Sequence, residues 1–310
     1  YMMIRPFIQF YTTQRCNSNC RHCYLAALKN ENAISYDDEM TTEQTLKAFE
    51  ILRKMGFSMV SFGGAEPTQK LDFFDIVKSL SEMGYDLKVH TNGMTIDEES
   101  AKILKCSEIF EVRISLDGSN REINDFIRGE GAFDALISGI KNCTAQGLPT
   151  TVAVTINKKN VSDLANIIDY AYQLGVGGVH SYLLIDKGRG VSLKDYLPDE
   201  HDLAYAHSVF ESKRLEYHGS KGIDPQKCLC KNGTCYLELK QNGDVYLYED
   251  SRAYFGIGVS KIGNIFDDGI EEQIDTALIG QKLPDCCSCD YYASFMCAEM
   301  DNYCFDDIKF

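Results

Sequence analysis

The sequence predicts an α/β fold, namely a partial (β/α)6 barrel followed by a small Cys-rich α+β domain. Two observations lead to this prediction. From Ile8 to about Arg189, short apolar, β-prone runs alternate with amphipathic stretches, as in repeated βα units around a parallel sheet. From about Lys221 onward, the chain is rich in Cys and punctuated by Gly. We therefore expect the barrel over residues 1–195, a connecting helix within 196–220 and the small domain over 221–310.

The barrel is expected to contain six strands with helices between them. The strands are predicted at residues 8–13, 58–62, 86–91, 110–115, 150–156 and 179–185. The helices are predicted at residues 43–55, 72–83, 98–105, 133–146 and 161–174. Because open folds of this kind bind ligands at the carboxyl ends of their strands, polar side chains that follow the strands are the first candidates for a site.

The connecting helix is predicted at residues 197–217. In the small domain, residues 236–240 and 244–248 are predicted to form a β-hairpin. The prediction depends on Asn242-Gly243, because an Asn-Gly pair between two alternating runs is a strong signal for a tight hairpin turn.

Composition excludes several classes of protein. A chain of 310 residues, 44% of them hydrophobic, can bury a large core. The formal net charge of −15 argues against a nucleic-acid partner, because binding the phosphate backbone uses Lys and Arg. The apolar stretches are far shorter than the roughly 20 residues of a membrane helix, and segment 1–11 lacks the features of a secretory signal. We expect a soluble, cytoplasmic protein with neither a nucleic-acid nor a membrane partner. Because residue 1 is Tyr rather than Met, a missing upstream segment stays an open alternative.

The chain has 13 Cys residues, which in a reducing compartment indicate metal ligands rather than disulfides. The first group is Cys16, Cys20 and Cys23, directly after the first predicted strand. Three thiolates can hold three irons of a 4Fe-4S cluster and leave the fourth iron open to another ligand. Zinc is a weaker alternative, because a structural zinc site needs four ligands and His22 lies between two of the cysteines. A ferredoxin-type cluster with a fourth, distal Cys stays open.

Further motifs follow the later strands: Gly63-Gly64-Ala65-Glu66-Pro67, Thr91-Asn92-Gly93, Ser115-Leu116-Asp117-Gly118 and Gly188-Arg189-Gly190. Behind the cysteine triplet and in this order, they resemble the motifs of the radical S-adenosylmethionine (SAM) superfamily over most of the chain. The resemblance implies a TIM-like partial barrel. It also implies that the Gly63–Pro67 motif holds the methionine amino group of SAM, because small residues allow a close approach and the Glu66 carboxylate suits an ammonium.

By the same resemblance, Ser115 is the strongest candidate for binding the SAM ribose, and Asp117 lies near it. Arg128 resembles an Arg that approaches the SAM carboxylate, and a guanidinium fork fits that group. The role of Gly188-Arg189-Gly190 stays open. Together with Tyr24, which directly follows the third cysteine, the SAM-binding candidates are Gly63, Gly64, Ala65, Glu66, Asn92, Ser115, Asp117 and Arg128.

Eight cysteines between Cys228 and Cys304 resemble the SPASM and twitch extensions of the family, which carry two auxiliary iron-sulfur clusters or one. Tyr248 stands where the SPASM pattern has a Cys, so the number of clusters is open. A zinc ribbon is the structural alternative. Cys228 and Cys287 are candidate catalytic hydrogen-atom donors. The expected auxiliary ligands are Cys230, Cys235, Cys286, Cys289, Cys297 and Cys304.

The resemblance implies reductive cleavage of SAM to a 5′-deoxyadenosyl radical, which abstracts a hydrogen atom from a C–H bond. We expect the substrate to be a residue of a ribosomally made peptide, modified by crosslinking, thioether formation, epimerisation, decarboxylation or oxidation. A dehydrogenase or cofactor-biosynthesis enzyme acting on a small molecule is one alternative. A non-catalytic electron carrier is another. The expected partners are a flavodoxin-type or ferredoxin-type reductant and a separate leader-recognition protein. The residues before Cys16 leave no room for a leader-recognition domain, so that domain is separate, was trimmed away or is not needed by the substrate.

Overall fold

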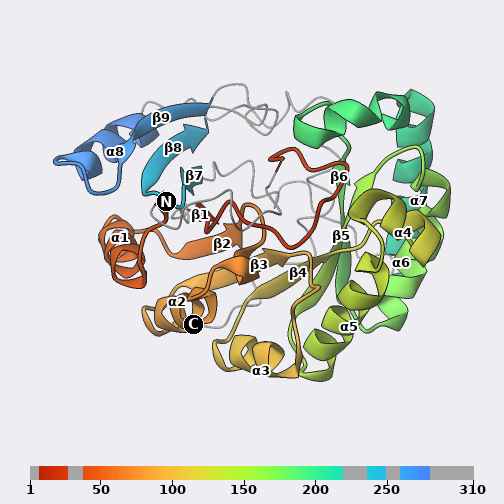
Figure 1. Ribbon diagram of the computed structural model, residues 1–310, viewed down its shortest axis with the longest axis horizontal. Coiled ribbons are helices and arrows are strands. Elements are labelled where there is room, and N and C mark those ends of the chain that lie inside the picture. The colour runs from red at the N-terminus through yellow and green to blue at the C-terminus, as the bar shows by residue number, and fades with distance from the viewer. Residues whose placement is uncertain (1–6, 27–37, 219–235, 249–258, 280–310) are drawn as a thin grey trace.

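The computed structural model describes residues 7–26, 38–218, 236–248 and 259–279, and Figure 1 shows their arrangement. In this part of the chain, nine strands form one sheet in the order β6-β5-β4-β3-β2-β1-β7-β8-β9. Strands β1 to β6 and β7 pair in parallel, whereas β8 and β9 are antiparallel to their neighbours. The strands are Phe7–Tyr11 (β1), Met59–Gly63 (β2), Asp86–Thr91 (β3), Glu111–Ser115 (β4), Thr150–Ile156 (β5), Gly178–Leu183 (β6), Tyr236–Leu239 (β7), Asp244–Tyr248 (β8) and Val259–Asn264 (β9).

The helices lie along the outer side of the curved sheet, as Figure 1 shows. The α-helices are Thr42–Lys54 (α1), Phe73–Glu82 (α2), Glu98–Cys106 (α3), Arg121–Arg128 (α4), Ala132–Ala145 (α5), Leu164–Gln173 (α6), Glu200–His218 (α7) and Ile270–Ile279 (α8). Short 3-10 helices cover Pro67–Gln69 (η3), Val161–Asp163 (η4) and Gly188–Tyr196 (η5). The α/β fold with a parallel sheet is therefore confirmed.

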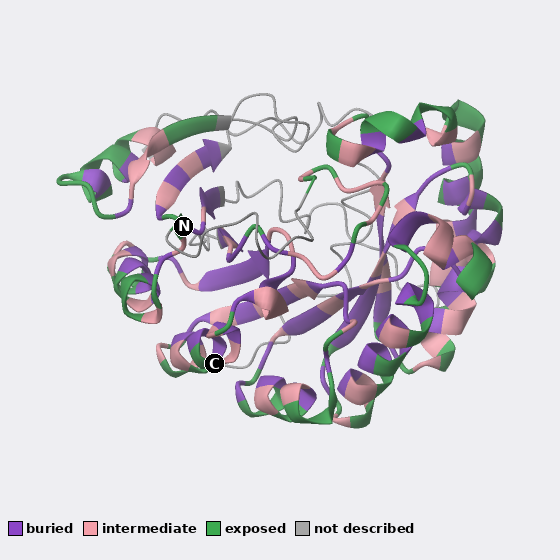
Figure 2. Ribbon diagram, in the orientation of Figure 1, coloured by how far each residue is buried: buried purple, intermediate pink, exposed green. Residues whose placement is uncertain are grey.

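The core lies between the sheet and the helices, where Figure 2 shows the buried residues. Strand β3 illustrates its origin: buried residues alternate with partly buried ones, so Leu87 and Val89 face the helices. The rings of Phe10, Phe62 and Phe73 pack in tilted and edge-on contacts that join β1, β2 and α2. This packing fixes the strands, and the loops at their carboxyl ends start from fixed positions.

All six predicted barrel strands are present, and each lies within two residues of its predicted bounds. The five predicted helices are also present, although the stretch predicted at 161–174 consists of η4 followed by α6. The predicted hairpin is confirmed as β7 and β8, with Leu239 opposite Val245. The connecting helix is present as α7. Strand β7 also pairs with β1, so the hairpin continues the barrel sheet.

Two α-helices, two 3-10 helices and one strand among the described residues were not predicted: α4, α8, η3, η5 and β9. Helix α4 is only eight residues long, with few apolar positions. Its sequence signal is Asn120, whose side chain accepts a hydrogen bond from the Ile123 N–H, and Gly129, which ends the helix. None of the helices in the described ranges is long and apolar enough to cross a bilayer.

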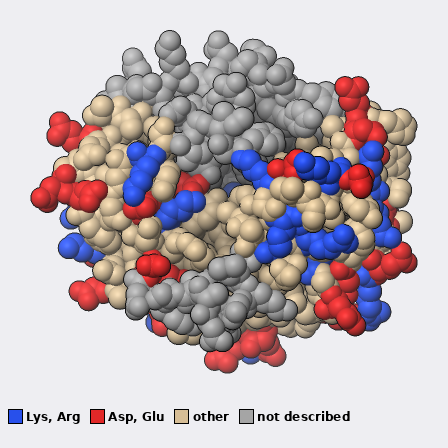
Figure 3. Space-filling model, turned by 45° about the horizontal axis from the view of Figure 1, so that its top comes forward, with Lys and Arg blue, Asp and Glu red and all other residues tan. Residues whose placement is uncertain are grey.

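Charge is mixed on the face of the molecule that Figure 3 shows. On the face that Figure 3 shows, acidic and basic side chains are interspersed, so the net negative charge is not gathered into one patch of this face.

Candidate active site

The three cysteines of the N-terminal motif lie on one loop, which follows β1. Cys16, Cys20 and Cys23 are free thiols and are partly exposed. Ser18 lies at the centre of the loop: its N–H donates to Cys16 Sγ over 3.4 Å, and its hydroxyl lies 3.1 Å from Cys20 Sγ. The Ser18 hydroxyl also donates to the Arg128 carbonyl at 3.0 Å, which ties the loop to the end of α4. The loop thus holds Cys16 and Cys20 around Ser18, and Cys23 follows on the same loop.

The stretch after β6 holds this loop from the other side. Arg189 Nε donates to the Cys20 carbonyl at 2.8 Å, and the Arg189 N–H donates to the Cys23 carbonyl at 3.0 Å. Gly188 has a φ of +55°, and a Cβ there would lie 2.4 Å from the Tyr24 carbonyl oxygen. Only glycine fits such an approach. Gly188 and Arg189 therefore clamp the cysteine loop, a role that the sequence left open.

Replacing Arg189 with alanine is expected to loosen the cysteine loop, because a charge-assisted hydrogen bond to Cys20 is lost. After reconstitution with iron and sulfide, we expect a chelator to remove iron about tenfold faster than from the unmodified protein, in line with a bond of about 1.5–3 kcal/mol. Iron release is followed by absorbance. Lys194→Ala changes an exposed cation of the same 3-10 helix and should release iron at the unmodified rate. Equal release from both variants would contradict the clamp.

Glu66 is a deeply buried acidic residue of the site. Its side chain is 1% exposed, and its carboxylate accepts four hydrogen bonds. The donors are the N–H and hydroxyl of Thr68 (3.2 and 2.8 Å), the Thr91 hydroxyl (2.7 Å) and the Asn92 N–H (2.7 Å). Burial raises the pKa of Glu66, whereas these hydrogen bonds act to lower it. No Lys or Arg of the described ranges forms an ion pair with it. A buried carboxylate without a counter-ion fits a ligand ammonium.

The backbone before Glu66 packs closely against the end of β1. Gly64 has a φ of +100°, and a Cβ there would lie 3.2 Å from Tyr11 Cα. The Glu66 N–H donates to the Arg15 carbonyl at 2.9 Å, so this segment continues alongside the loop after β1. The Gly-Gly-Ala-Glu segment therefore lies directly beside the cysteine loop.

Asn92 joins the carboxylate to the cysteines. Its N–H binds Glu66, while its Nδ2 donates to Asn17 Oδ1 at 2.6 Å and lies 3.9 Å from Cys16 Sγ. Asn17 was not among the predicted site residues, although it lies inside the cysteine motif. The predicted residues Cys16, Glu66 and Asn92 thus form one connected group.

Ser115, Asp117 and Arg128 lie at the adjoining strand end and in α4. Ser115 is half-buried and forms no side-chain hydrogen bond with a described residue, so its hydroxyl can bind a ligand. Asp117 is fully buried, and its Oδ1 accepts from the Thr155 N–H at 2.6 Å. Its Oδ2 lies 2.8 Å from Arg128 Nε, an ionic contact without the alignment of a hydrogen bond. The structure therefore pairs Asp117 with Arg128, which gives both residues a structural role.

Tyr24 and the remaining cysteines of the chain are distributed as follows. The Tyr24 hydroxyl lies 3.3 Å from that of Tyr11, at the end of the cysteine loop. Cys106 is exposed and Cys143 is buried in α5. The C-terminal cysteines lie outside the described residues: Cys228, Cys230, Cys235, Cys286, Cys287, Cys289, Cys297 and Cys304.

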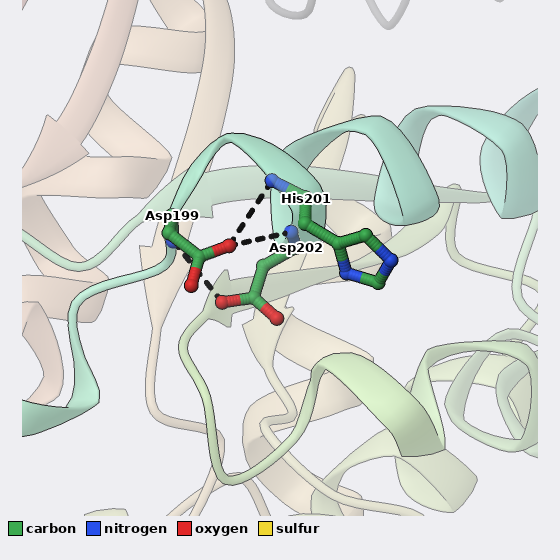
Figure 4. Close-up of side chains that lie close together, drawn as sticks. All are labelled: Asp199, His201 and Asp202. Atoms are coloured by element: carbon green, nitrogen blue, oxygen red, sulfur yellow. Dashed lines mark hydrogen bonds between the residues drawn. The ribbon is translucent and has the colours of Figure 1, made fainter.

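A second group with metal-ligand chemistry lies at the start of α7, where Asp199, His201 and Asp202 are close together (Figure 4). Asp199 Oδ1 accepts hydrogen bonds from the N–H groups of His201 and Asp202 at 3.0 and 3.1 Å. Its other oxygen lies 3.0 Å from Lys158 Nζ. These contacts are those of a helix N-cap with a surface ion pair, and they account for the group without a metal.

Three partly exposed thiols on one loop, a buried carboxylate with no Lys or Arg paired to it among the described residues, and a curved parallel sheet fit a radical SAM enzyme. The sequence profile of the radical SAM superfamily matches residues 10–171, and the chain belongs to this superfamily. The donor set fits the cofactors that the family implies: Cys16, Cys20 and Cys23 would hold a 4Fe-4S cluster, and Glu66 would face the SAM ammonium.

Three related proteins are similar to this chain in sequence. Fe-coproporphyrin III synthase of Methanosarcina barkeri is 36% identical over 187 residues, which cover 60% of this chain and 46% of that protein. Mycofactocin maturase MftC of Mycolicibacterium smegmatis is 32% identical, again over 46% of its length, so the matched part is about half of either relative. MftC of Mycobacterium ulcerans is 28% identical over 305 residues, covering 91% of this chain and 79% of that protein.

Solved structures share the fold. Streptococcus suis SuiB bound to SAM aligns with a TM-score of 0.66 and 18% identity, over 93% of this chain and 71% of that one. The enzyme anSMEcpe with bound SAM and a Kp18Cys peptide aligns with a TM-score of 0.68 and 18% identity, over 93% of this chain and 87% of that one. At this identity the likeness concerns the fold alone.

Proposed function

We propose that this chain modifies a residue of a ribosomally made peptide by abstracting a hydrogen atom from a C–H bond. The supporting observation is the extent of the match to MftC of Mycobacterium ulcerans, which covers 91% of this chain. The matches to Fe-coproporphyrin III synthase and to MftC of Mycolicibacterium smegmatis each cover 60% of the chain. The part beyond the barrel therefore has its counterpart in a maturase.

The chain's residues would divide the work. When bound, the cluster and SAM supply a one-electron reduction and the 5′-deoxyadenosyl radical. Cys16, Cys20 and Cys23 would hold the cluster, and the Arg189 clamp would keep their loop in place. Glu66 and Ser115 would bind SAM by its ammonium and ribose. The sheet and its helices would exclude water from the reacting centre.

The Cys-rich segment completes the proposal. We propose that the domain over 221–310, joined to the barrel of 1–195 through 196–220, holds one or two auxiliary clusters of the SPASM or twitch type. Its proposed ligands are Cys230, Cys235, Cys286, Cys289, Cys297 and Cys304, with Cys228 and Cys287 as hydrogen-atom donors. A flavodoxin-type or ferredoxin-type reductant and a separate leader-recognition protein would be its partners in the cytoplasm.

A small-molecule substrate is the second candidate. It is favoured by the 36% identity to Fe-coproporphyrin III synthase, which is higher than that to the MftC proteins. Membership of the radical SAM superfamily argues against the third alternative, a non-catalytic electron carrier.

Mass spectrometry of candidate peptides tests the proposal. Peptides encoded beside the gene are incubated anaerobically with the reconstituted protein, SAM and a reductant. We expect the mass of one peptide to change, and to stay unchanged with Cys16→Ala. If SAM is cleaved while every peptide keeps its mass, the peptide proposal is wrong and the small-molecule alternative takes its place.

A further inference from the structure

The concave face of the sheet carries charged side chains deep inside the half-barrel. On β3, Lys88 and His90 alternate with Leu87 and Val89, so they point away from the helix-facing core. Lys88 pairs with Glu111 across the sheet, and His90 pairs with Arg113. We call Lys88, His90, Glu111 and Arg113 the inner charged cluster. It makes no described contact with Cys16, Glu66 or Ser115.

Glu111 is the centre of this cluster. Its Oε1 accepts from Arg113 Nη2 and Nε at 2.8 and 3.0 Å and from the Thr151 hydroxyl at 2.6 Å. His180 Nε2 lies 3.3 Å from the same oxygen. Arg113 Nη1 also donates a hydrogen bond to the Tyr182 hydroxyl at 2.8 Å. The guanidinium and the carboxylate are therefore bound to each other and to the sheet.

Lys88 has fewer polar contacts than Arg113. Its ammonium lies 3.3 Å from Glu111 Oε2, but this oxygen has no aligned hydrogen bond. The Lys88 side chain is 21% exposed and lies over the Phe110 ring at 5.0 Å. Its N–H groups can therefore donate to another acceptor.

The cluster carries more positive than negative charge. Glu111 is one carboxylate, and Lys88 and Arg113 are two cations. Burial, with the charge of Arg113, lowers the pKa of His90 to about 3 and that of His180 to about 4, so both imidazoles are neutral at pH 7. The surplus cation lies inside a chain whose formal net charge is −15. Lys88 and Arg113 share the single carboxylate of Glu111, so an anionic ligand would complete the ion pairing of Lys88.

The position of the cluster suits a substrate. His90 directly precedes Thr91 and Asn92, which bind Glu66, and Arg113 lies two residues before Ser115 on β4. Two residues along a strand correspond to about 6.6 Å. Arg113 thus lies one layer below Ser115. Lys88 lies level with Glu111, four residues or about 13 Å before Ser115, on the same face of the sheet.

We propose that the inner charged cluster binds a carboxylate of the substrate, with Lys88 as the ion-pairing group and His90 as a hydrogen-bond donor. His90 forms no hydrogen bond with a described residue, and although it is mostly buried, part of it stays exposed to a ligand. This inference rests on the proposed function, since the carboxylate of a peptide is either its C-terminus or an Asp or Glu side chain.

Three small probes separate these sources: N-acetylalanine, its amide, and N-acetylaspartic acid α-amide. Their affinities for the reconstituted protein with SAM, without reductant, are measured by ligand-observed NMR. We expect a carboxylate probe to bind and the neutral amide not to bind. Binding of the first probe alone identifies a C-terminal carboxylate, and binding of the aspartate probe a side chain. Because no turnover is involved, the result does not depend on whether a peptide is modified.

Variants link binding to Lys88. Lys88→Met should lower the affinity for the carboxylate probe about tenfold or more, whereas Lys88→Arg should retain this affinity. Lys102→Met removes an exposed lysine of α3 and should leave the affinity unchanged. Lys88→Gln, whose amide can still donate to Glu111, replaces the methionine variant if thermal unfolding shows that variant to be unstable. The proposal is overturned if acid and amide bind alike, if no probe binds, or if loss of the Lys88 charge leaves affinity unchanged.

Discussion

Replacing Glu66 with glutamine is expected to weaken SAM binding by about 100-fold or more, since an interaction of roughly 3–5 kcal/mol is lost when one partner of a buried ion pair is removed. The amide keeps the shape of the carboxylate. It can accept from the Asn92 N–H while donating to the hydroxyls of Thr68 and Thr91, so most of the local hydrogen bonds persist. The charge that would face the SAM ammonium is removed. Calorimetric titration of SAM measures the loss.

The control for this experiment is Glu82→Gln, because Glu82 is an exposed carboxylate of α2. Its affinity for SAM should equal that of the unmodified protein. Iron content should be the same in both variants, because Glu66 is not a proposed cluster ligand. A Glu66→Gln protein that binds SAM as tightly as the control would show that the carboxylate does not hold the ammonium.

Replacing Cys20 with alanine is expected to abolish the N-terminal cluster, since two thiolates cannot hold the three irons that the motif binds. The variant should lose the iron of one 4Fe-4S cluster per chain, and 5′-deoxyadenosine formation should fall to the level without protein. Iron analysis and electron paramagnetic resonance after reduction measure the first effect. Chromatography of the nucleoside measures the second.

Cys106→Ala is the matched control, because Cys106 is an exposed thiol at the end of α3, outside the loop. It should keep both the iron and the activity. If Cys20→Ala retained its full iron content and still cleaved SAM, the cluster would have to be held elsewhere in the chain.

Much of the fold could be predicted because its signals are local. The alternation of apolar residues marks the six barrel strands, and the Asn242-Gly243 pair marks the hairpin. The pairing of β1 with β7 was not predicted, since it joins residues more than 200 positions apart and no local pattern encodes it. Helix α4 was missed because it is short and has few apolar residues, so no helical repeat is visible in its sequence.

Some residues of the site could likewise be predicted from local motifs, and others could not. Cys16, Glu66, Asn92 and Ser115 are recognisable because each lies in a short motif after a strand. The Asp117–Arg128 pair and the Arg189 clamp are not, because a buried ion pair and a contact across 169 residues depend on the folded chain. Likewise, Lys88 and Glu111 are only polar residues in two strands until the sheet places them side by side.

The most direct test of the central claim is the cleavage of SAM by the reconstituted protein. Under anaerobic conditions with a one-electron reductant, the unmodified chain is expected to form 5′-deoxyadenosine and methionine in equal amounts, whereas Cys16→Ala forms neither. Formation of no more nucleoside by the unmodified chain than by Cys16→Ala would contradict the assignment of this loop and strand edge as a radical SAM site.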